Sequence, residues 1–349
     1  MRNDPAPAVL CLSAPEVARL VRRRGLDAVI SGIAARIEAD LARWPAFDKR
    51  ARVATHSADG VIELMPISDA THYAFKYVNG HPKNPRVGLP TVMAFGVLVE
   101  VATGAPRLLA EMTLTTAIRT AAMSALAAQR LARPGSQRLA LIGNGAQAEF
   151  QAIALRALTG VRELRLYDLD AAVTAKLVRN LAGAGFELQR CASVADAVRG
   201  ADIVTTLTAN RARAAIVTPE MVEPGMHLNA VGGDCPGKTE LHPQVLAGAS
   251  VFVEYEPQTR VEGELQQLPA EFPVTEFWRV VAGEHPGRRS PADVTVFDSV
   301  GFALEDFSAL CWLHDAARAD GVGQPIELIP AIADPRDLYA LLRDEAAPG

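Results

Sequence analysis

The sequence has no long apolar run and no excess of positive charge. Its longest apolar run covers residues 92–99 and ends at Glu100, far short of the roughly 20 residues that a membrane-spanning helix needs. The 35 Lys and Arg residues against 40 Asp and Glu residues give a formal net charge of −5, which argues against a broad surface for nucleic acid or anionic lipid. These absences favour a small-molecule partner, with no nucleic acid and no membrane.

Cysteine is scarce, and no targeting segment is evident. The four cysteines lie far apart, with no C-x-x-C pair and no histidines at zinc-ligand spacing. The only apolar stretch near the N-terminus covers residues 8–12 and follows no basic segment, unlike a secretory signal. We therefore expect reduced cysteines, a cytoplasmic location and no metal. The 49% hydrophobic and 21% charged content excludes disordered, collagen-like and coiled-coil proteins.

The order of patterns along the 349 residues predicts two domains. Ser13 and Glu16 form a capping-box signature that opens two helices, separated at Gly25. Residues 51–113 contain short apolar stretches between turn residues, which predicts a mostly antiparallel sheet. Residues 115–133 predict a long connecting helix, because they hold no Gly or Pro and are rich in Ala.

After residue 135 the pattern alternates between strand and helix, which is typical of a doubly wound parallel sheet. The stretches HLNAV, SVFVEY and VTVFDS predict further strands of that sheet, and residues 301–319 predict a closing helix with an acidic start. The last 30 residues are too few for a domain and are expected to return to the first one. The predicted fold is therefore α/β, a Rossmann-type sheet over residues 121–321 with an α+β domain from residues 1–120 and 322–349.

The segment RLALIGNGAQA matches the G-x-G-x-x-G/A pattern of dinucleotide-binding turns, with Gly143, Gly145 and Ala148 at its small-residue positions. The glycines lie between a predicted strand and a predicted helix, where the helix N-terminus favours a pyrophosphate. About 20 residues later, Asp168 follows the next strand and would accept hydrogen bonds from ribose while repelling a 2′-phosphate. The pattern favours NAD over NADP; the alternative is a glycine turn in an α/β domain without a ligand.

Three isolated charges lie in apolar or small-residue settings. Arg119 is the only charged residue between residues 112 and 129, and we expect it to find a carboxylate or phosphate rather than a solvated helix face. Lys76 shares a strand face with His72 and Ala74, opposite Tyr73, Phe75 and Tyr77, and the pattern alone favours a surface position. For Glu63, on the face of Val61 and Met65, a pocket and an exposed sheet edge remain equally open.

Asp234 follows a predicted strand and two glycines, Gly232 and Gly233. Ligands of doubly wound sheets bind at the carboxyl ends of the strands, so this carboxylate is expected at the rim of the substrate site. Glycines there would let a substrate approach the backbone closely. The alternative is an aspartate that only forms a turn.

Several segments of the sequence together resemble the ornithine cyclodeaminase and mu-crystallin family, and the likeness extends over nearly the whole chain. KYVNGHP and GGDCPGKTEL carry more of the likeness than the glycine loop, which many oxidoreductases share. RVATHS, IELMP, AIRTAAMSALAA and VTVFDSVGFALED resemble the family as well. The resemblance implies a homodimer that binds NAD and a small amino acid. The stretch KNPRVGLP over residues 83–90 is a local departure.

The resemblance also implies roles for individual residues. Arg52, Lys76 and Arg119 would hold the carboxylate of the amino acid, with Glu63 and Val300 as further substrate contacts and Asp234 as the catalytic aspartate. The implied cofactor contacts are Thr91, Arg119, Gly143, Gly145, Ala146, Gln147, Asp168, Thr208, Val231, Gly232, Gly233, Asp234, Lys238 and Ser299.

The implied reaction converts L-ornithine into L-proline and ammonia, with NAD taking a hydride from Cα and later returning it. The same site could instead cyclise lysine, because the one methylene by which lysine exceeds ornithine is worth only about 1–3 kcal/mol in a pocket. It could also reduce a preformed cyclic imine or act as an ordinary amino-acid dehydrogenase. A protein that binds NAD without catalysis, as a crystallin does, is the alternative from another class.

Overall fold

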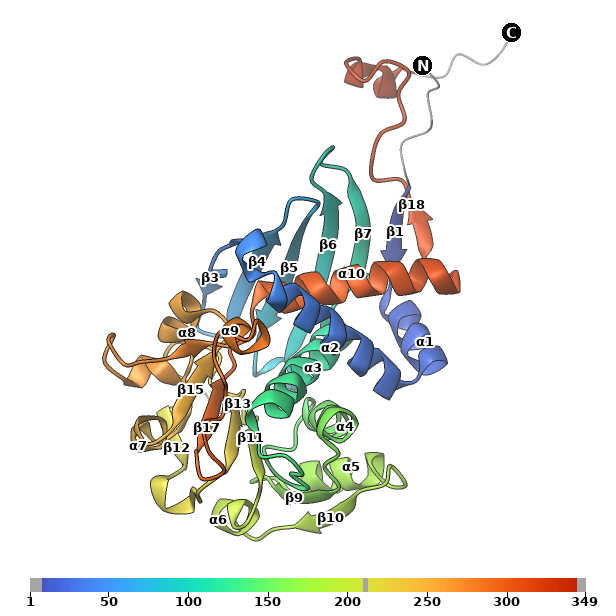
Figure 1. The fold of residues 1–349 in the computed structure, drawn as a ribbon. Helices are drawn as coiled ribbons and strands as arrows, with labels where there is room; N and C mark the ends of the chain where they lie inside the picture. The colour runs from blue at the N-terminus through green and yellow to red at the C-terminus, as the bar shows by residue number, and fades with distance from the viewer. Residues whose placement is uncertain (1–7, 210–212, 344–349) are drawn as a thin grey trace.

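The chain folds around two large β-sheets with a layer of helices between them (Figure 1). The computed structural model describes residues 8–209 and 213–343. Within this part of the chain, each of the two sheets has eight strands, and a third sheet has two. The predicted fold class is confirmed, because one sheet is wholly parallel and the other is mostly antiparallel.

The first sheet joins both ends of the chain. Its central strands β4 (Val61–Ser68), β5 (His72–Gly80), β6 (Val92–Glu100) and β7 (Pro106–Glu111) are antiparallel neighbours. β2 (Asp48–Lys49) and β3 (Val53–His56) both pair with β4. β1 (Val9–Leu12), which the sequence analysis did not predict, runs parallel to β7 and antiparallel to β18 (Gln324–Ile326). The expected return of the C-terminal segment to the first domain is thus confirmed for β18.

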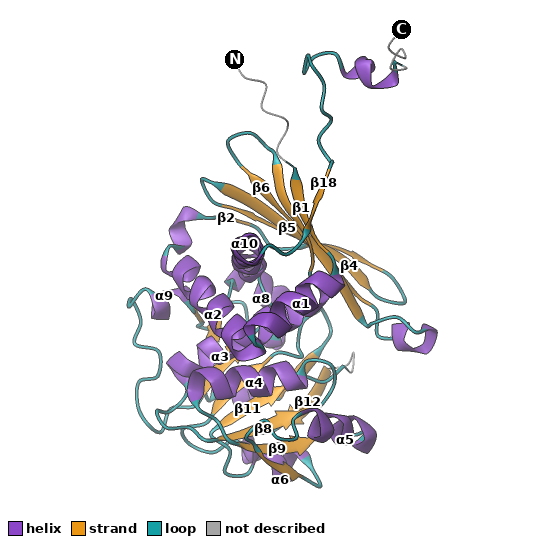
Figure 2. Cartoon of the chain, turned by 90° about the vertical axis from the view of Figure 1, so that its right-hand side faces the viewer, coloured by secondary structure: helices purple, strands orange, loops and turns teal. Residues whose placement is uncertain are grey.

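Four helices cover one face of this sheet (Figure 2). They are α1 (Ala14–Arg24), α2 (Leu26–Ala42), α3 (Thr113–Leu131) and α10 (Ala303–Asp320). The predicted capping box is present at α1, where the backbone N–H of Ser13 donates to Glu16 at 2.8 Å. α3 buries nearly all its side chains, because its Ala, Thr and Ser residues let α2, α4 and α10 pack closely.

No helix covers the opposite face of the first sheet (Figure 2). This face carries Tyr73, Phe75 and Tyr77 of β5 and Phe95 of β6. Tyr73 and Phe95 are exposed there, as are Ile62 and Leu64 of β4. The face of Lys76 is instead the one that packs under the helices, and Lys76 is only 1% exposed. The surface position that the pattern favoured for Lys76 is therefore wrong, because alternation distinguishes two faces without saying which one the helices cover.

The second sheet has the order β10-β9-β8-β11-β13-β17-β15-β16, and all its strands are parallel. In chain order, the strands are β8 (Arg138–Ile142), β9 (Glu163–Tyr167), β10 (Glu187–Arg190), β11 (Ile203–Thr206), β13 (His227–Ala230), β15 (Ser250–Val253), β16 (Thr275–Glu276) and β17 (Thr295–Asp298). Crossover helices are α4 (Ala148–Thr159), α5 (Ala171–Asn180), α6 (Val194–Val198), α7 (Pro243–Ala247), α8 (Glu256–Glu262) and α9 (Trp278–Val281). The strand and helix alternation predicted after residue 135 is confirmed.

The sequence analysis missed the small elements of this half of the chain. β12 (Arg213–Val217) and β14 (Thr239–Leu241) form the separate two-stranded sheet, and β16 extends the edge of the large one. Strands of two to five residues are too short for a clear periodicity. In the described residues no helix is long and apolar enough to cross a membrane.

The placement of α10 bears on the division into domains. This helix packs against β4, β5 and β6 of the first sheet and against α2. The division into residues 1–120 with 322–349 and residues 121–321 stays a proposal, and the packing of α10 favours ending the second part near residue 302. Beyond β18 the chain leads away from the body to a short helical turn at Leu338–Leu342 (Figure 1).

Candidate active site

The candidate site lies where the strands of the parallel sheet end. Parallel strands bring all their carboxyl ends to one edge, and ligands of such sheets bind in the crevice outside it. Reading along the sheet from β9 to β15, this edge carries Asp168, Gly143, Thr208, Asp234, Ser299 and Glu254. Most of the residues predicted to bind the cofactor therefore lie along one line.

The glycine loop has the geometry that a dinucleotide requires. Gly143 has φ +91°, and a Cβ there would lie 2.8 Å from the carbonyl carbon of Leu207, so a larger residue would strain both the backbone and its neighbour. A Cβ on Gly145 would meet nothing within 4 Å, which leaves open space beside the loop. Asp168 accepts the backbone N–H of Asn144 at 2.7 Å, which fixes the loop and leaves lone pairs on the carboxylate for a ribose hydroxyl.

Lys76 and Arg119 meet two acids at the start of α10. The Nζ of Lys76 donates to Asp306 at 2.9 Å, and the Nε of Arg119 lies 2.9 Å from the same carboxylate. Arg119 also donates through Nη1 to Glu305. The expectation that the isolated guanidinium finds a carboxylate is confirmed, and its partners are the acids noted only as an acidic helix start.

Arg52 is buried between two further acids. Its Nη1 donates to Glu63 at 3.1 Å, and its Nε lies 3.1 Å from Oε2 of Glu262. Its Nη2 donates to the carbonyl oxygens of Val300 and Gly301 at 2.7 and 2.6 Å. Glu63 is 7% exposed, so the alternative of an exposed sheet edge is wrong, and Glu63 lies within the cationic cluster.

Burial shifts the acidity of these groups. Desolvation and the neighbouring Arg119 lower the pKa of Lys76 to about 8, against the opposing effect of Asp306. Burial also raises the pKa of Glu262 to about 7, although the Arg52 cation opposes this shift. For Arg119, the carboxylates of Asp306 and Glu305 outweigh the cost of burial and raise the pKa. Strongly shifted groups that meet in one place are typical of functional sites.

Asp234 stands at the rim of this cluster, in the loop after β13. It accepts from the Nζ of Lys238 at 3.1 Å, and its side chain is 52% exposed. A cavity of about 210 Å³ opens beside it, lined by His56 and Val61 of the first domain and by residues 235–238. Asp234 therefore directly precedes a loop that borders β3 and β4 of the first sheet.

The two glycines before Asp234 are required by the protein itself, and the close approach of a substrate to them stays a prediction. A Cβ on Gly233 would lie 2.6 Å from the carboxylate of Glu264, and a Cβ on Gly232 would collide with Glu240. These buried acids support the loop from below, since Glu264 accepts the N–H of Glu240 at 2.7 Å and Glu240 accepts the N–H of Thr208 at 2.7 Å. The glycines make room for protein side chains.

The segment from Ser299 to Gly301 links the two halves of the site. Glu254 accepts from the Oγ of Ser299 at 2.6 Å and from the N–H groups of Val300 and Gly301 at 3.2 Å. The carbonyls of Val300 and Gly301 in turn hold Arg52. Burial, with the charge of Glu305, raises the pKa of Glu254 to about 8.

Among the residues predicted to contact the cofactor, Thr91 lies apart from the glycine loop, whereas Ala146 and Gln147 belong to it. Thr91 lies before β6, where its carbonyl accepts from His81, and no described contact links it to the parallel sheet. Ala146 and Gln147 lie in the loop itself, and Gln147 has a buried Oε1 with no hydrogen-bond partner among the described residues. The sequence analysis missed Glu254, Glu262, Glu305 and Asp306, although Glu305 and Asp306 lie within VTVFDSVGFALED, which carries part of the resemblance.

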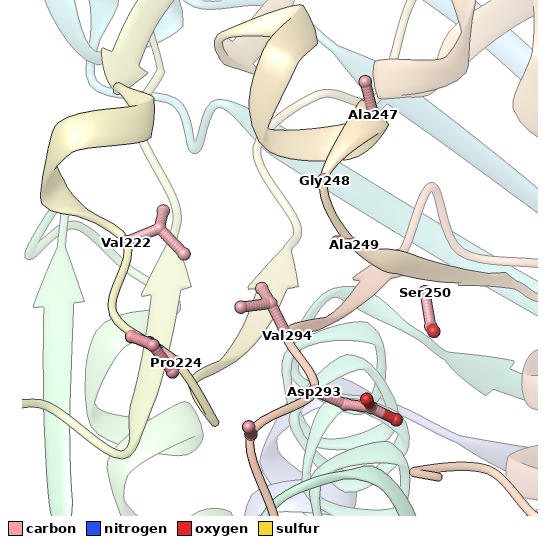
Figure 3. Close-up of a pocket in the computed structure, with 9 residues that line it drawn as sticks. Val222, Pro224, Ala247, Gly248, Ala249, Ser250, Asp293 and Val294 are labelled. Atoms are coloured by element: carbon pink, nitrogen blue, oxygen red, sulfur yellow. The ribbon is translucent and has the colours of Figure 1, made fainter. Parts of the chain in front are cut away.

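The larger cavity described in the structure lies elsewhere (Figure 3). It has a volume of about 510 Å³ and is lined by residues before or at the start of β13, β15 and β17, among them Val222, Ser250 and Val294. This is the amino-terminal edge of the parallel sheet. The carboxylate of Asp293 there accepts the N–H groups of Arg289 and Ser290. The cavity is therefore separate from the candidate site.

Fold and site together define a class of protein, a dinucleotide-binding α/β enzyme with a buried cation cluster beside the nucleotide crevice. The sequence comparison then identifies the family. Residues 17–321 match the model of the ornithine cyclodeaminase/mu-crystallin family, and the chain belongs to that family.

Three known proteins illustrate the similarity. An ornithine cyclodeaminase of Brucella suis biovar 1 (strain 1330) is 55% identical over 331 residues, which are 95% of this chain and 92% of that protein. A solved structure of lysine cyclodeaminase, described for its recognition of L-lysine, L-ornithine and L-2,4-diaminobutyric acid, has a TM-score of 0.90 and 32% identity and covers 96% of this chain and 100% of its own. An archaeal alanine dehydrogenase dimer with bound NAD has a TM-score of 0.84 and 31% identity and covers 93% and 100%.

Proposed function

We propose that this protein is an ornithine cyclodeaminase that converts L-ornithine into L-proline and ammonia with NAD as a catalytic cofactor. The 55% identity to a curated ornithine cyclodeaminase over nearly the whole chain supports the reaction. The feature of the structure that carries the proposal is the meeting of Arg52, Lys76 and Arg119 with Glu63 beside Asp234. Such a site can recognise a carboxylate and an ammonium in one ligand. The free thiols of Cys11, Cys191 and Cys311 accord with a cytoplasmic location.

The residues at the carboxyl edge of the parallel sheet fit NAD. The open space beside Gly145 and the N-terminus of α4 offer room and backbone N–H donors for the pyrophosphate. Asp168 would hold the ribose hydroxyls and repel a 2′-phosphate. NAD, when bound, supplies a hydride acceptor that takes the hydride from Cα and returns it to the cyclic imine.

The cation cluster orients the substrate. Arg119 and Lys76 would bind its carboxylate, so that Cα faces the nicotinamide end of the crevice. Fixing the reacting atoms in this way lowers the entropic part of the barrier. Arg119, the partner of acids from α10, lies close to Gly301, where a Cβ would fall 2.7 Å from its Nη1. The close approach holds the guanidinium at the edge of the nucleotide crevice.

Asp234 would act on the far end of the substrate. It accepts a proton from the distal ammonium, and the freed amine attacks the α-imine carbon to form the new C–N bond of the five-membered ring. The α-amino nitrogen then leaves as ammonia, and the resulting cyclic imine is reduced to L-proline. Hydride removed equals hydride returned, so the reaction has no net redox change.

The test is an incubation of the purified protein with L-ornithine and with much less NAD than ornithine, followed by assays of ammonia and proline. We expect many turnovers per NAD, one ammonia per proline and no accumulation of NADH. One turnover or none per NAD would contradict the proposal. NADH accumulation would indicate an amino-acid dehydrogenase, and turnover of a cyclic imine without ornithine deamination would indicate a reductase.

Lysine cyclodeaminase is the second candidate, because the described lysine cyclodeaminase structure matches this fold with a TM-score of 0.90. A parallel incubation with L-lysine separates the two, since a lysine cyclodeaminase forms pipecolate faster than proline. L-arginine serves as a negative control. Failure of every substrate, with NAD still bound, would favour a crystallin-like binding protein.

We further propose a homodimer in which the uncovered face of the first sheet meets a second copy of the chain. Ile62, Leu64, Tyr73 and Phe95 form an exposed apolar group on three adjacent strands of this face. Contiguous exposed apolar surface is typical of an interface. The alanine dehydrogenase of the same fold is described as a dimer.

A further inference from the structure

Arg52 is nearly saturated by protein acceptors, which limits what it can offer a substrate. A guanidinium has five N–H donors. Both Nη2 hydrogens are directed to the carbonyls of Val300 and Gly301, one Nη1 hydrogen goes to Glu63, and Nε faces Glu262. Lys76 and Arg119 are less occupied by the described residues, so they carry most of the substrate carboxylate. Arg52 instead fixes two acids on the other side of the pocket.

Glu262 is the unexplained member of this arrangement. It ends α8, is 6% exposed, and its Oε2 lies 3.1 Å from Nε of Arg52 without a well-directed hydrogen bond among the described residues. Arg52 from the segment before β3, Glu63 from β4 and Asp234 from the loop after β13 are the charged groups that act on it, and Lys238 stands behind Asp234. Two carboxyl groups thus contact one guanidinium, and the carboxylate of Asp234 adds negative charge nearby.

An excess of acids over Arg52 suits a substrate with a second positive charge. We propose that Glu262 is a specificity-determining residue, a third carboxyl group of the pocket that positions Arg52 and gives up its proton when a ligand with a distal ammonium binds. Before binding, like charge from Glu63 and Asp234 and the low-dielectric surroundings favour the protonated carboxyl. The incoming ammonium adds positive charge beside Glu63 and Asp234, and Glu262 becomes a carboxylate as its proton passes to the buffer.

The pKa of Glu262 supports the proposal. Burial raises the pKa of Glu262 to about 7, so the group is about half protonated at neutral pH. The distal amine of ornithine is an alkyl ammonium with a pKa of about 10 and is fully charged there. Binding therefore releases about half a proton per site at pH 7 from Glu262. The inference rests on the proposed function, because it assumes a diamino acid in this pocket.

The experiment measures protons released on binding by titration calorimetry in two buffers of different ionisation enthalpy. The protein is saturated with NADH, which prevents oxidation of the ligand. L-ornithine is compared with L-norvaline, which has the same carbon chain without the distal amine. We expect ornithine to release about half a proton more than norvaline at pH 7. The wild-type comparison alone overturns the proposal if the two ligands release equal numbers of protons.

Variants assign the effect to one residue. In Glu262→Gln the difference between ornithine and norvaline should vanish. The KM for ornithine, which should fall about tenfold from pH 6 to pH 8 in the wild type, should become nearly flat while kcat changes less. Glu256→Gln is the matched control, because Glu256 begins the same helix, is 40% exposed and pairs with Arg260. The control should behave as the wild type does.

Two outcomes remain to be separated. Proton release that persists in Glu262→Gln would overturn the proposal. If that variant does not fold, as judged by thermal unfolding and NADH binding, Glu262→Asp replaces it. Glu262→Asp keeps a carboxyl group on a shorter side chain, so it should still release a proton when ornithine binds. The pH at which that release is half-maximal should differ from the wild type, and an unchanged value would also overturn the proposal. A wild-type protein that forms no ammonia from ornithine would instead refute the proposed function, whatever the calorimetry shows.

Discussion

At the scale of single residues, the site separates buried, ion-paired cations from one half-exposed carboxylate. Lys76, Arg119 and Arg52 are buried and ion-paired, whereas Asp234 is half exposed and bonded only to Lys238 among the described residues. A group that exchanges a proton during turnover needs a way to pass it on, and the exposed position of Asp234 provides one.

We predict that Asp234→Asn lowers the turnover of L-ornithine by about 10² or more, the usual contribution of a positioned acid or base. The amide retains the size of the side chain and loses its basicity. Ammonia release measures turnover, and quenching of protein fluorescence by NADH shows whether the cofactor still binds. Near-wild-type turnover would remove Asp234 from the mechanism.

Glu254 gives a prediction for stability against pH. Its folded-state pKa of about 8 lies above the usual value of 4.5, so the stability that it contributes is complete below about pH 4.5 and is lost as the pH rises through about 8. Asp298 and Glu262, with pKa values of about 7, act in the same direction. The stability that these three groups contribute should fall over this range.

Glu254→Gln removes one of these three contributions. Because the amide stays neutral, the melting temperature of the variant should rise relative to the wild type as the pH increases from 6 to 8.5. Thermal unfolding without ligands, at constant ionic strength, measures the difference. A difference that is independent of pH would show that Glu254 is already ionised in the folded protein.

At the scale of elements, the turn between β8 and α4 separates two reasons for a glycine. Gly143 is required by the protein itself, through its positive φ and the nearby carbonyl group of Leu207. Gly145 has no protein atom near its absent side chain, so its requirement should come from the ligand alone. The two alanine variants are matched controls for one another.

We predict that Gly143→Ala destabilises the protein by about 1–3 kcal/mol even without NAD, because an alanine there is strained. Gly145→Ala should unfold at the wild-type temperature without NAD and should lose most of the thermal stabilisation that NAD gives to the wild type. Thermal shift with and without NAD measures both effects. Normal NAD stabilisation in Gly145→Ala would place the pyrophosphate elsewhere.

At the scale of the whole molecule, two features have no packing partner among residues 8–209 and 213–343. One is the apolar outer face of the first sheet, and the other is the C-terminal segment after β18, where Leu338 and Leu342 are exposed (Figure 1). An isologous dimer would bury the same face of both copies. The first sheet would then lie between its own helix layer and a second sheet.

We predict that Phe95→Asp shifts the protein from dimer to monomer in sedimentation equilibrium. A charge buried at an interface without a partner is costly. The control is Val261→Asp, a similarly exposed apolar position on α8, away from this face. A dimer of undiminished strength in Phe95→Asp would show that the two chains meet through another surface.

The sequence by itself determined the order of elements and much of the site. Local signals decided these features, since the capping box at Ser13, the glycine turn at Gly143 and the alternating strands depend on residues close together in the chain. The positions of Asp168, Asp234 and Arg119 were also predictable, because each breaks a local pattern at a strand end or within an apolar helix, and their ligand contacts stay predictions.

Only the tertiary structure decided which groups face one another. The burial of Lys76 depends on which sheet face α10 covers, and alternation along β5 leaves that open. Glu254, Glu262, Glu305 and Asp306 gain their roles from residues more than 180 positions away, such as Arg52, Lys76 and Arg119, or from a loop some 45 residues on. Such contacts leave no periodic trace in the sequence, because a charge–charge pair constrains only distance in space.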